Sequence, residues 1–314
     1  MCVYIIIYFI YLSFKNQLSK LRDQFITNQT QPNQKLMKNK FNLLVAFLAL
    51  GIAFTACNKD ASVEQQDQSQ PRELGALFLP TSEYAKIPTA VLTRDEQLKA
   101  LPTAVILQTP APGDQGGEGS CVAWGTTFAA RSITKHIVNS SYAINTDIFS
   151  PEYVYNQIKA TSDCGSGSYV TTGLNLLRDQ GVCTWASMPY TDVSCSLQPN
   201  ATQKYEATNY KVTYAKINIT TAELKAHLAA GRAVVVAGSV NNDFMYLANN
   251  SVLTRYKGKS LGGHCYCVIG YDDAKNAFKF QNSWGTSWAS AGFGWINYSN
   301  IGSWWREAYV MYNN

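Results

Sequence analysis

The sequence is poor in charged residues and has no excess of either sign in the part expected to fold. Asp, Glu, Lys and Arg make up 15% of the 314 residues. Six of the 26 Lys and Arg and one of the 21 Asp and Glu lie in residues 1–57, which leaves 20 of each sign in residues 58–314. A nucleic-acid-binding domain needs a basic excess to neutralise phosphates, so we expect no nucleic-acid partner.

The sequence also lacks an internal repeat and a long apolar run. The absence of a repeating period excludes solenoid and propeller folds. Two apolar stretches near the N-terminus, within residues 1–14 and from Phe41 to Phe54, are both shorter than the roughly 20 residues that a membrane-spanning helix needs. With 46% hydrophobic residues the chain has ample material for a core, which indicates a globular protein of one or two domains.

Residues 37–57 have the layout of an export signal. Two lysines, Lys38 and Lys40, precede the apolar run, and Thr55-Ala56-Cys57 follows it. Small residues directly before a cysteine resemble the lipobox of bacterial lipoproteins, in which Cys57 would be diacylated and become the mature N-terminus. We therefore expect an exported protein, anchored by lipid in the cell envelope at the outer membrane or cell surface. A plain signal peptide and an uncleaved anchor are the alternatives.

The chain around this signal divides into three further parts. Residues 1–36 precede a complete signal, which is explained if translation begins at Met37 and the first segment is an over-long gene start; a second membrane segment is the alternative. Residues 58–100 are rich in Gln, Ser, Pro and Thr and have little periodicity, which is typical of a tether or a short pro-region. The folded body is expected over residues 101–314.

The body changes character near residue 210. Apolar spacing predicts a helix from Cys121 to Val138 and further helices from Ser150 and over Gly173–Gln180. Short runs of β-formers separated by turn residues predict strands over most of residues 211–314. The prediction is an α+β protein with a helical lobe at about 101–210, a β lobe at about 211–314, and the functional site in the cleft between them.

The segment QGGEGSCVAW, residues 115–124, places a single thiol at the start of a predicted helix. Only a few per cent of a free cysteine is thiolate at neutral pH, because its reference pKa is about 8.5. A helix N-terminus and a neighbouring imidazole both favour the thiolate. Cys121 is therefore a candidate nucleophile that requires a histidine.

The chain has only three histidines. His136 is on the helix that Cys121 begins, about 22 Å further along its axis, and cannot reach the thiol. His227 lies in a helical pattern, and we expect it to be a partly exposed surface residue. His264 follows two glycines, which allow close approach of a substrate backbone, and begins a predicted strand. It is the one candidate for a general base.

A catalytic imidazole also needs a group that orients its second nitrogen. The segment Gln281-Asn282-Ser283-Trp284-Gly285 follows His264 by about 18 residues. Asn282 can accept a hydrogen bond from the ring, and Trp284 can shield that bond from water.

These segments together resemble the papain-like, cathepsin-type cysteine peptidases. Gln115, Cys121, Gly263-His264 and Asn282-Ser-Trp-Gly occur in that family's order and at similar spacing over residues 101–314. The resemblance implies a papain-like two-lobe fold with a β-barrel-like second lobe, and a monomeric enzyme, an endopeptidase, that acts on peptide or protein substrates without a metal or cofactor. It implies Cys121 as nucleophile, His264 as base and acid, Asn282 as orienter and Gln115 as oxyanion donor, with Gly263 and Trp284 in the substrate cleft.

The sequence departs from that family at Glu118, where a disulfide-forming cysteine is usual. Cys164 resembles the cysteine that usually forms this disulfide with the residue at the Glu118 position. It would then be unpaired or paired with another cysteine. Cys183 and Cys195 enclose a short loop, and we predict a disulfide between them. Cys265 and Cys267 lie on one face of a strand among apolar residues, which favours buried thiols over a metal pair.

Two other classes of function remain open at this point. Glu118 near the nucleophile is compatible with a catalytically weak or inactive surface lipoprotein that binds peptides or host protein. A thiol-dependent acyltransferase or cell-wall amidase would share the Cys-His chemistry. The pockets that would set substrate preference are made of residues far apart in the chain.

Overall fold

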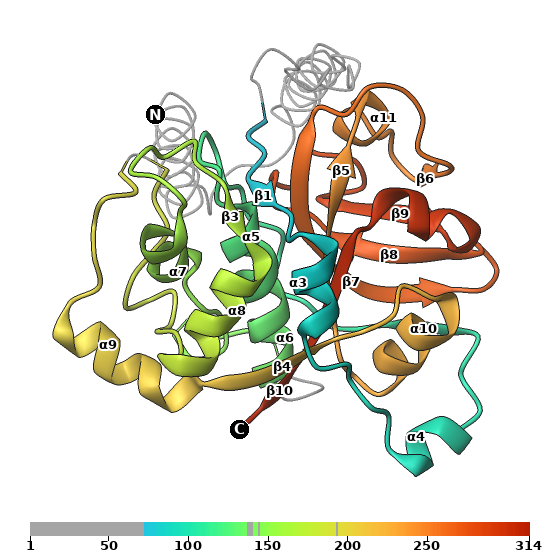
Figure 1. Cartoon of the computed structure of the whole chain (residues 1–314), viewed down its shortest axis with the longest axis horizontal. Helices are drawn as coiled ribbons and strands as arrows, with labels where there is room; N and C mark the ends of the chain where they lie inside the picture. Colours follow the sequence, from blue (N-terminus) through green and yellow to red (C-terminus); the bar gives the residue numbers. More distant parts are fainter. Residues whose placement is uncertain (1–71, 137–140, 144, 193) are drawn as a thin grey trace, which may run out of the picture. The chain divides into compact units, whose positions relative to one another are not determined.

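The computed structural model describes residues 72–136, 141–143, 145–192 and 194–314 (Figure 1). The gene-start segment 1–36, the export signal 37–57 with its lipid site Cys57, and residues 58–71 lie outside this part. No helix within the described ranges has the length and apolar character needed to cross a membrane.

Helices dominate the first half of the described chain, which we call the helical lobe. Local signals explain several of their ends: Ser150 caps the N-terminus of one helix by accepting from the Tyr153 amide, with Pro151 as its first residue, and Asn200 and Gln203 form a capping box at another. These helices are α5 Cys121–Ala123, η1 Trp124–Arg131, α6 Ser132–Lys135, α7 Pro151–Ile158, α8 Val170–Asp179, α9 Ala201–Ala207 and η2 Thr208–Tyr210. The first three form one continuous helix, whose middle part, η1, has π-helical bonding.

Strands dominate the second half, the β lobe. They are β4 Val212–Lys216, β5 Val234–Val240, β6 Val252–Leu253, β7 Gly262–Asp272, β8 Ala277–Gln281, β9 Phe293–Asn297 and β10 Glu307–Asn313. Four short helical segments connect them: α10 Thr221–Ala229, α11 Asn242–Met245, η3 Tyr298–Asn300 and α12 Ile301–Trp304. In Figure 1 the green and yellow helices of the first lobe lie to the left of the orange and red strands. The predicted α+β architecture is confirmed.

Apart from β1, Ala76–Leu77, and β3, Ser168–Tyr169, which pair only with each other, the strands of the described chain join in one large sheet. Its order is β4-β10-β5-β7-β8-β9-β6, and β2, Ala104–Ile106, pairs antiparallel with β7. The longest strand, β7, therefore contacts three others, and His264 lies near its start, opposite Gly238 of β5. The pairing of β7 with β5 therefore fixes the backbone position of His264.

Alternation along the central strands divides the hydrophobic core in two. Successive side chains of a strand point to opposite faces. On β5, Val235 lies in the core shared with the helical lobe, whereas Val234 and Val236 lie in the core of the β lobe. The same alternation places Cys265 and Cys267 in the first core, where both are buried free thiols, and Tyr266 in the second. One sheet thus holds both lobes together at the level of His264.

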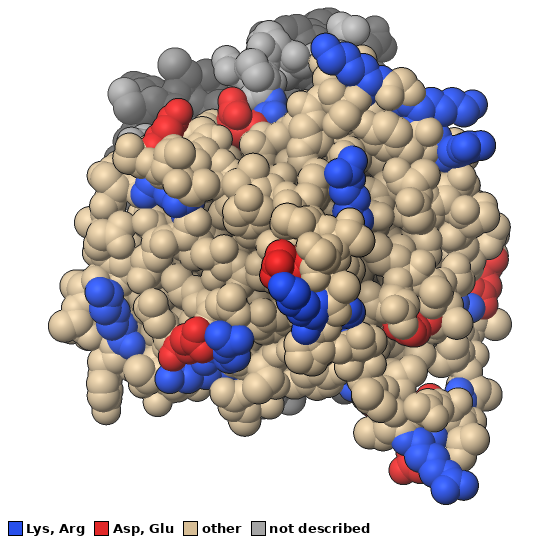
Figure 2. All heavy atoms as spheres, viewed as in Figure 1, with Lys and Arg blue, Asp and Glu red and all other residues tan. Residues whose placement is uncertain are grey.

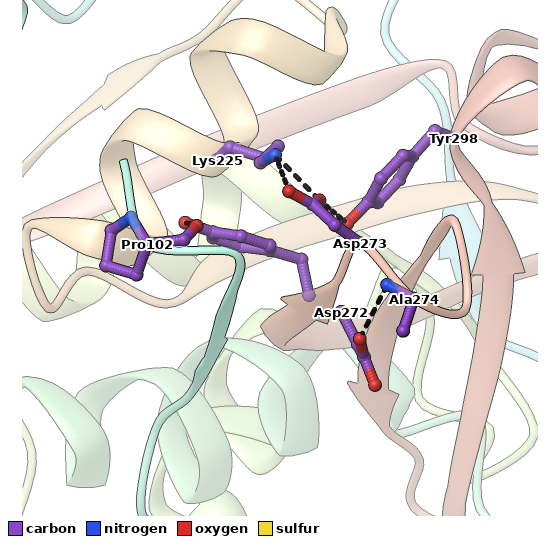
Figure 3. A network of polar contacts seen from close by, with 7 residues as sticks. Pro102, Lys225, Asp272, Asp273, Ala274 and Tyr298 are labelled. Atoms are coloured by element: carbon purple, nitrogen blue, oxygen red, sulfur yellow. Dashed lines mark hydrogen bonds and ion pairs between the residues drawn. The ribbon is translucent and has the colours of Figure 1, made fainter. Parts of the chain in front are cut away.

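A polar network fixes the far corner of the β lobe (Figure 3). Lys225 of α10 pairs with Asp273 at 2.7 Å, and the Tyr298 hydroxyl donates to the same carboxylate at 2.8 Å. The Tyr271 hydroxyl donates to the Pro102 carbonyl at 2.8 Å. The network links the β7–β8 turn to α10 and to the chain before β2, so residues 102–106 belong structurally to the β lobe although they precede the helices.

The folded part of the chain begins before Leu101. Residues 72–100 include β1 Ala76–Leu77, α3 Thr81–Lys86 and α4 Arg94–Leu98. Strand β1 pairs in parallel with β3, Ser168–Tyr169, of the helical lobe. The Tyr84 hydroxyl of α3 donates to the Ala308 carbonyl of β10. This described part of the expected tether or pro-region is packed on the body.

The predicted Cys183–Cys195 disulfide is wrong. Cys195 pairs with Cys164, with the two Cα atoms 5.5 Å apart, and Cys183 is a buried free thiol in the core of the helical lobe. The short loop between Cys183 and Cys195 suggested proximity, but the helical lobe directs Cys183 inward and brings Cys164 to Cys195 instead. Cys164, which resembles the family's usual disulfide partner of the residue at position 118, is therefore paired with Cys195 here.

Candidate active site

Cys121 is the first residue of α5 and is completely buried. The backbone amides of Cys265, next to His264 in β7, and of Gly75 are directed at its thiol. Burial raises the pKa of the Cys121 thiol to about 11, because a thiolate would lose its hydration there. The sulfur therefore lies against the strand that carries the candidate base.

His264 and Asn282 form the hydrogen bond expected from their spacing. His264 Nε2 lies 2.7 Å from Asn282 Oδ1, which also accepts from the Ser283 amide at 2.9 Å. The Trp284 ring stacks on the imidazole with centroids 4.5 Å apart, so it covers this bond. His264 Nδ1 has no hydrogen-bond partner within the described residues, which leaves it available for proton transfer.

Gln115 is buried and its side-chain amide is held at both ends. Its Oε1 accepts from the Ser283 hydroxyl at 2.7 Å, and its Nε2 donates to the Glu118 carbonyl at 2.8 Å and the Glu73 carbonyl at 3.2 Å. Because Ser283 fixes the oxygen end, the nitrogen end faces the site. Sequence reasoning missed this role of Ser283, although the residue is part of the Asn-Ser-Trp-Gly segment.

The structure thus brings four of the sequence-predicted residues together and places Trp284 beside them. The four are Cys121, His264, Asn282 and Gln115. Solvent does not reach the candidate nucleophile or the candidate base of this group, because Cys121 and His264 both have an exposed fraction of 0%.

Residues Arg72–Leu79, which we call the strap, cover the site. Gly75 O accepts from the Ser168 amide at 2.8 Å, and the Leu79 amide donates to the Glu307 carboxylate at 2.7 Å. The Arg72 guanidinium lies 5.6 Å from the centre of the Trp284 ring and donates to the Met245 carbonyl. The strap therefore runs from the β lobe over the candidate catalytic residues to β3 of the helical lobe and returns to β10 of the β lobe.

Two glycines permit this close crossing. A Cβ atom on Gly75 would lie 1.9 Å from the Gly119 carbonyl oxygen, and one on Gly263 would lie 2.1 Å from the Ala76 carbonyl oxygen. The space beside Gly263, expected to admit a substrate backbone, is filled by the chain's own strap. A sequence signal existed in the apolar segment Leu74–Leu79, which breaks the polar composition of its surroundings.

The candidate pair, Cys121 and His264, is uncharged in this closed arrangement. Burial lowers the pKa of His264 to about 4, and the hydrogen bond to Asn282 opposes this effect only in part. With the thiol pKa at about 11, neutral pH leaves a thiol beside a neutral imidazole. Renewed contact with water would favour the charged form of both groups.

The other two histidines lie away from this cluster. The His136 ring stacks on Tyr142. The expectation of a partly exposed His227 is wrong: its side chain is buried, and Nδ1 accepts from Arg232 at 3.1 Å. Burial and the neighbouring guanidinium lower the pKa of His227 to about 4. Neither histidine competes with His264.

Comparison with known proteins places this arrangement among thiol proteases. Residues 108–312 match the family model described as papain family cysteine protease. An uncharacterized peptidase C1-like protein of Acanthamoeba polyphaga mimivirus is 26% identical over 195 residues, which are 57% of this chain and 62% of that protein. Gamete and mating-type specific protein A of Dictyostelium discoideum is 30% identical over 62% of this chain and 41% of its own length. The chain thus spans about two fifths to three fifths of these curated relatives.

Solved structures show the same fold. Xylellain, a cysteine protease from Xylella fastidiosa, superposes with a TM-score of 0.65 at 25% identity, over 78% of this chain and 98% of that chain. ProCathepsin B S9 from Trypanosoma congolense gives a TM-score of 0.62 at 16% identity, over 77% and 87% of the two chains.

Proposed function

Because the chain belongs to the papain family of cysteine proteases, we propose that it hydrolyses peptide bonds through a thioester with Cys121. The observation that carries this proposal is the buried contact between the Cys121 sulfur and the amide beside His264, with His264 held by Asn282 at 2.7 Å. These are the nucleophile, base and orienter that acyl transfer requires.

The proposed reaction has two halves. His264 Nδ1 accepts the thiol proton, and the sulfur bonds to the peptide carbonyl carbon while the π electrons move to its oxygen. As the C–O double bond reforms, the C–N bond breaks and the amine leaves with the proton from His264. Water, deprotonated by His264, then adds to the thioester, and the C–S bond breaks to give a carboxylic acid and the free thiol.

Gln115 Nε2 is the proposed side-chain donor to the oxygen of the tetrahedral intermediate, beside the Cys121 amide. In the closed structure this nitrogen already donates to a peptide carbonyl, that of Glu73. A single donor of this kind typically contributes 100- to 1000-fold in kcat. Gln115→Ala should therefore lower kcat by about that factor while the thiol still reacts with alkylating agents.

We further propose that the strap must leave before substrate enters. It fills the space beside Gly263 and keeps the catalytic pair neutral. The described chain is then the inactive form, and activation requires displacement or cleavage of residues 72–79.

An endopeptidase is the proposed type. The strap continues past Cys121 in both directions, from Arg72 near Trp284 to Ala76 of β1, which pairs with β3, and it does not end in the site. A cleft that accommodates extended chain on both sides of the sulfur favours cleavage within a polypeptide over removal of a terminal residue.

Hydrolysis of a fluorogenic peptide library by the full chain, before and after limited proteolysis of the strap, tests the proposal. Cleavage should appear after proteolysis and be lost in Cys121→Ala and after treatment with an epoxide thiol inhibitor. A folded, strap-free protein that binds peptides without cleaving them would instead support the inactive surface lipoprotein, which the residue Glu118 first suggested. Release of cell-wall fragments would support an amidase.

Export and lipid attachment at Cys57 remain part of the proposal. They are supported by the layout of residues 37–57 and by the Cys164–Cys195 disulfide, since disulfides persist in oxidising compartments. Labelled fatty acid should be incorporated by the wild type and not by Cys57→Ala. Incorporation by both proteins would show that the lipid is attached to another residue and would contradict the role of Cys57.

A further inference from the structure

Glu118 lies between the candidate oxyanion donor and the nucleophile, in the loop that carries both. The side chain is 1% exposed, and its Oε1 has no hydrogen-bond partner within the described residues. Its other oxygen, Oε2, lies 3.0 Å from the Tyr190 hydroxyl. A buried carboxyl group with so few partners is costly to ionise.

The Tyr190 hydroxyl is the centre of a small oxygen cluster. It lies 2.7 Å from the Gln115 carbonyl, 2.8 Å from the Ser120 hydroxyl and 3.0 Å from Glu118 Oε2. A phenol has one proton to donate, whereas a carbonyl and an ionised carboxylate can only accept. If Glu118 is ionised, Tyr190 cannot serve both acceptors. Either the carboxylate lacks the Tyr190 proton, or the Gln115 carbonyl keeps only the longer hydrogen bond from the Glu118 amide, at 3.5 Å.

Protonation of Glu118 completes the cluster. Glu118 then donates to the Tyr190 oxygen, and Tyr190 donates to the Gln115 carbonyl. The tyrosine oxygen has a second lone pair for the Ser120 hydroxyl, so every short contact has one donor and one acceptor. In this state the backbone of Gln115 is held by Tyr190 and its side-chain oxygen by Ser283.

The charged surroundings also favour the proton. Glu152 of α7 and Asp192, two residues after Tyr190, face Glu118 with like charge, and the Tyr155 hydroxyl of α7 lies nearby. Lys159, which follows α7, opposes them, but its ammonium donates to the Cys195 and Asn156 carbonyls. Burial is the largest effect, and together these groups raise the pKa of Glu118 to about 7.

We propose that Glu118 is a positioning residue whose protonated carboxyl group, acting through Tyr190, holds Gln115 in place to donate to the oxyanion. This inference rests on the proposed peptidase function and extends it to how the donor is held. Where papain-like peptidases usually have a cysteine in a disulfide, this chain has a hydrogen-bonded relay that depends on one proton. Loss of that proton as the pH rises should loosen the donor and lower kcat with little change in KM.

The test compares kcat and KM from pH 5 to 9 for the activated wild type, Glu118→Gln and Tyr190→Phe. The glutamine amide can donate to Tyr190 but does not titrate near neutrality, so Glu118→Gln should retain kcat at pH 5.5 and lack the decline in kcat that Glu118 causes near pH 7. Tyr190→Phe should lower kcat about tenfold at pH 5.5 and by less above pH 7, where the wild type has itself lost the relay, with KM within about threefold. Tyr205→Phe, a change at an exposed tyrosine, is the matched control and should have no effect.

The relay is overturned if Glu118→Gln and the wild type have the same pH profile and Tyr190→Phe retains full kcat with a native melting temperature. A second readout does not depend on turnover. In ¹³C-Glu NMR spectra, the wild-type resonance that is absent from the spectrum of Glu118→Gln is that of Glu118. It should titrate near neutral pH. Titration near 4.3, the ordinary value for Glu, contradicts the inference. A wild type that folds but cleaves nothing would contradict the proposed function, and this titration would still decide whether the relay exists.

Discussion

At the scale of single residues, the unusual feature is a proposed catalytic pair that is buried in its uncharged form. The thiol pKa of about 11 and the imidazole pKa of about 4 have the same main cause, loss of contact with water under the strap. Electrostatics and access therefore act together, since the strap both blocks substrate and suppresses the thiolate.

Alkylation kinetics can separate these two states. In the intact chain, labelling of Cys121 by iodoacetamide should be slow at pH 7 and should rise with pH up to about 11, where the thiolate forms. After removal of the strap, labelling at pH 7 should be at least tenfold faster, as measured by peptide mass spectrometry. Cys183, a buried free thiol whose pKa burial raises to about 12, is the internal control and should stay slow. Equal rates at Cys121 in both forms would contradict the closed site.

Glu118 should also make stability depend on pH. Its pKa is about 7 in the folded protein and about 4.5 in the unfolded chain, so the folded state holds the extra proton between these values. The contribution of Glu118 to the free energy of unfolding is therefore largest below pH 4.5. It falls by on the order of 3 kcal/mol as the pH rises to 7. The difference in melting temperature between Glu118→Gln and wild type should grow over that range. A constant difference would contradict it.

Sequence motifs made most of the candidate site predictable, but they did not indicate the residues that hold its side chains in place. The chemistry of a thiol at a helix start and of an imidazole near an amide is visible in local sequence. The direction of the Ser283 hydroxyl depends on how the two lobes meet, and that of the Tyr190 hydroxyl on packing within the helical lobe. The pairing of Cys164 with Cys195 also depends on packing within the helical lobe, so loop length alone gave the wrong partner.

At the scale of elements, the strap is held by close backbone contacts that only glycine permits. Gly75 approaches Gly119 so closely that any side chain would collide with its carbonyl oxygen. Sequence composition suggested a tether or a short pro-region here because the segment has little periodicity. Its order comes from strand pairing with β3 and from contacts far along the chain, which local pattern cannot show.

Gly75→Ala should therefore release the strap and activate the enzyme without proteolysis. The added methyl group would lie 1.9 Å from the Gly119 oxygen, which no small shift of this backbone contact can accommodate. We expect peptide hydrolysis by the intact variant to exceed that of the intact wild type by at least tenfold. Gly302→Ala, where a methyl group meets nothing within 4 Å, is the matched control. Continued silence of intact Gly75→Ala, with normal activity after cleavage, would contradict the role of the strap.

At the scale of the whole molecule, the described part of the chain combines little charge with extensive burial. Figure 2 shows one face on which acidic and basic side chains are few and lie singly or in small groups on a mostly uncharged surface. The two-lobe arrangement was predictable because helical and alternating patterns occupy separate halves of the sequence. The exception is residues 102–106, which cross to the β lobe through pairing of β2 with β7, and no local pattern indicated that crossing.

Contacts between residues far apart in the sequence must then contribute much of the stability of the helical lobe. The disulfide is the contact whose contribution to the free energy of unfolding can be calculated. Cys164 and Cys195 are separated by 31 residues, a loop whose closure restricts the unfolded chain by about 3.5 kcal/mol. Cys195→Ser should lower the free energy of unfolding in guanidinium chloride by about that amount, and reductant should have no further effect on the variant. Cys183→Ala should stay sensitive to reductant, because Cys183 is not paired. If Cys183→Ala instead loses that sensitivity while Cys164→Ser keeps it, the pairing is Cys183–Cys195 after all and the packing of this lobe differs from the one described.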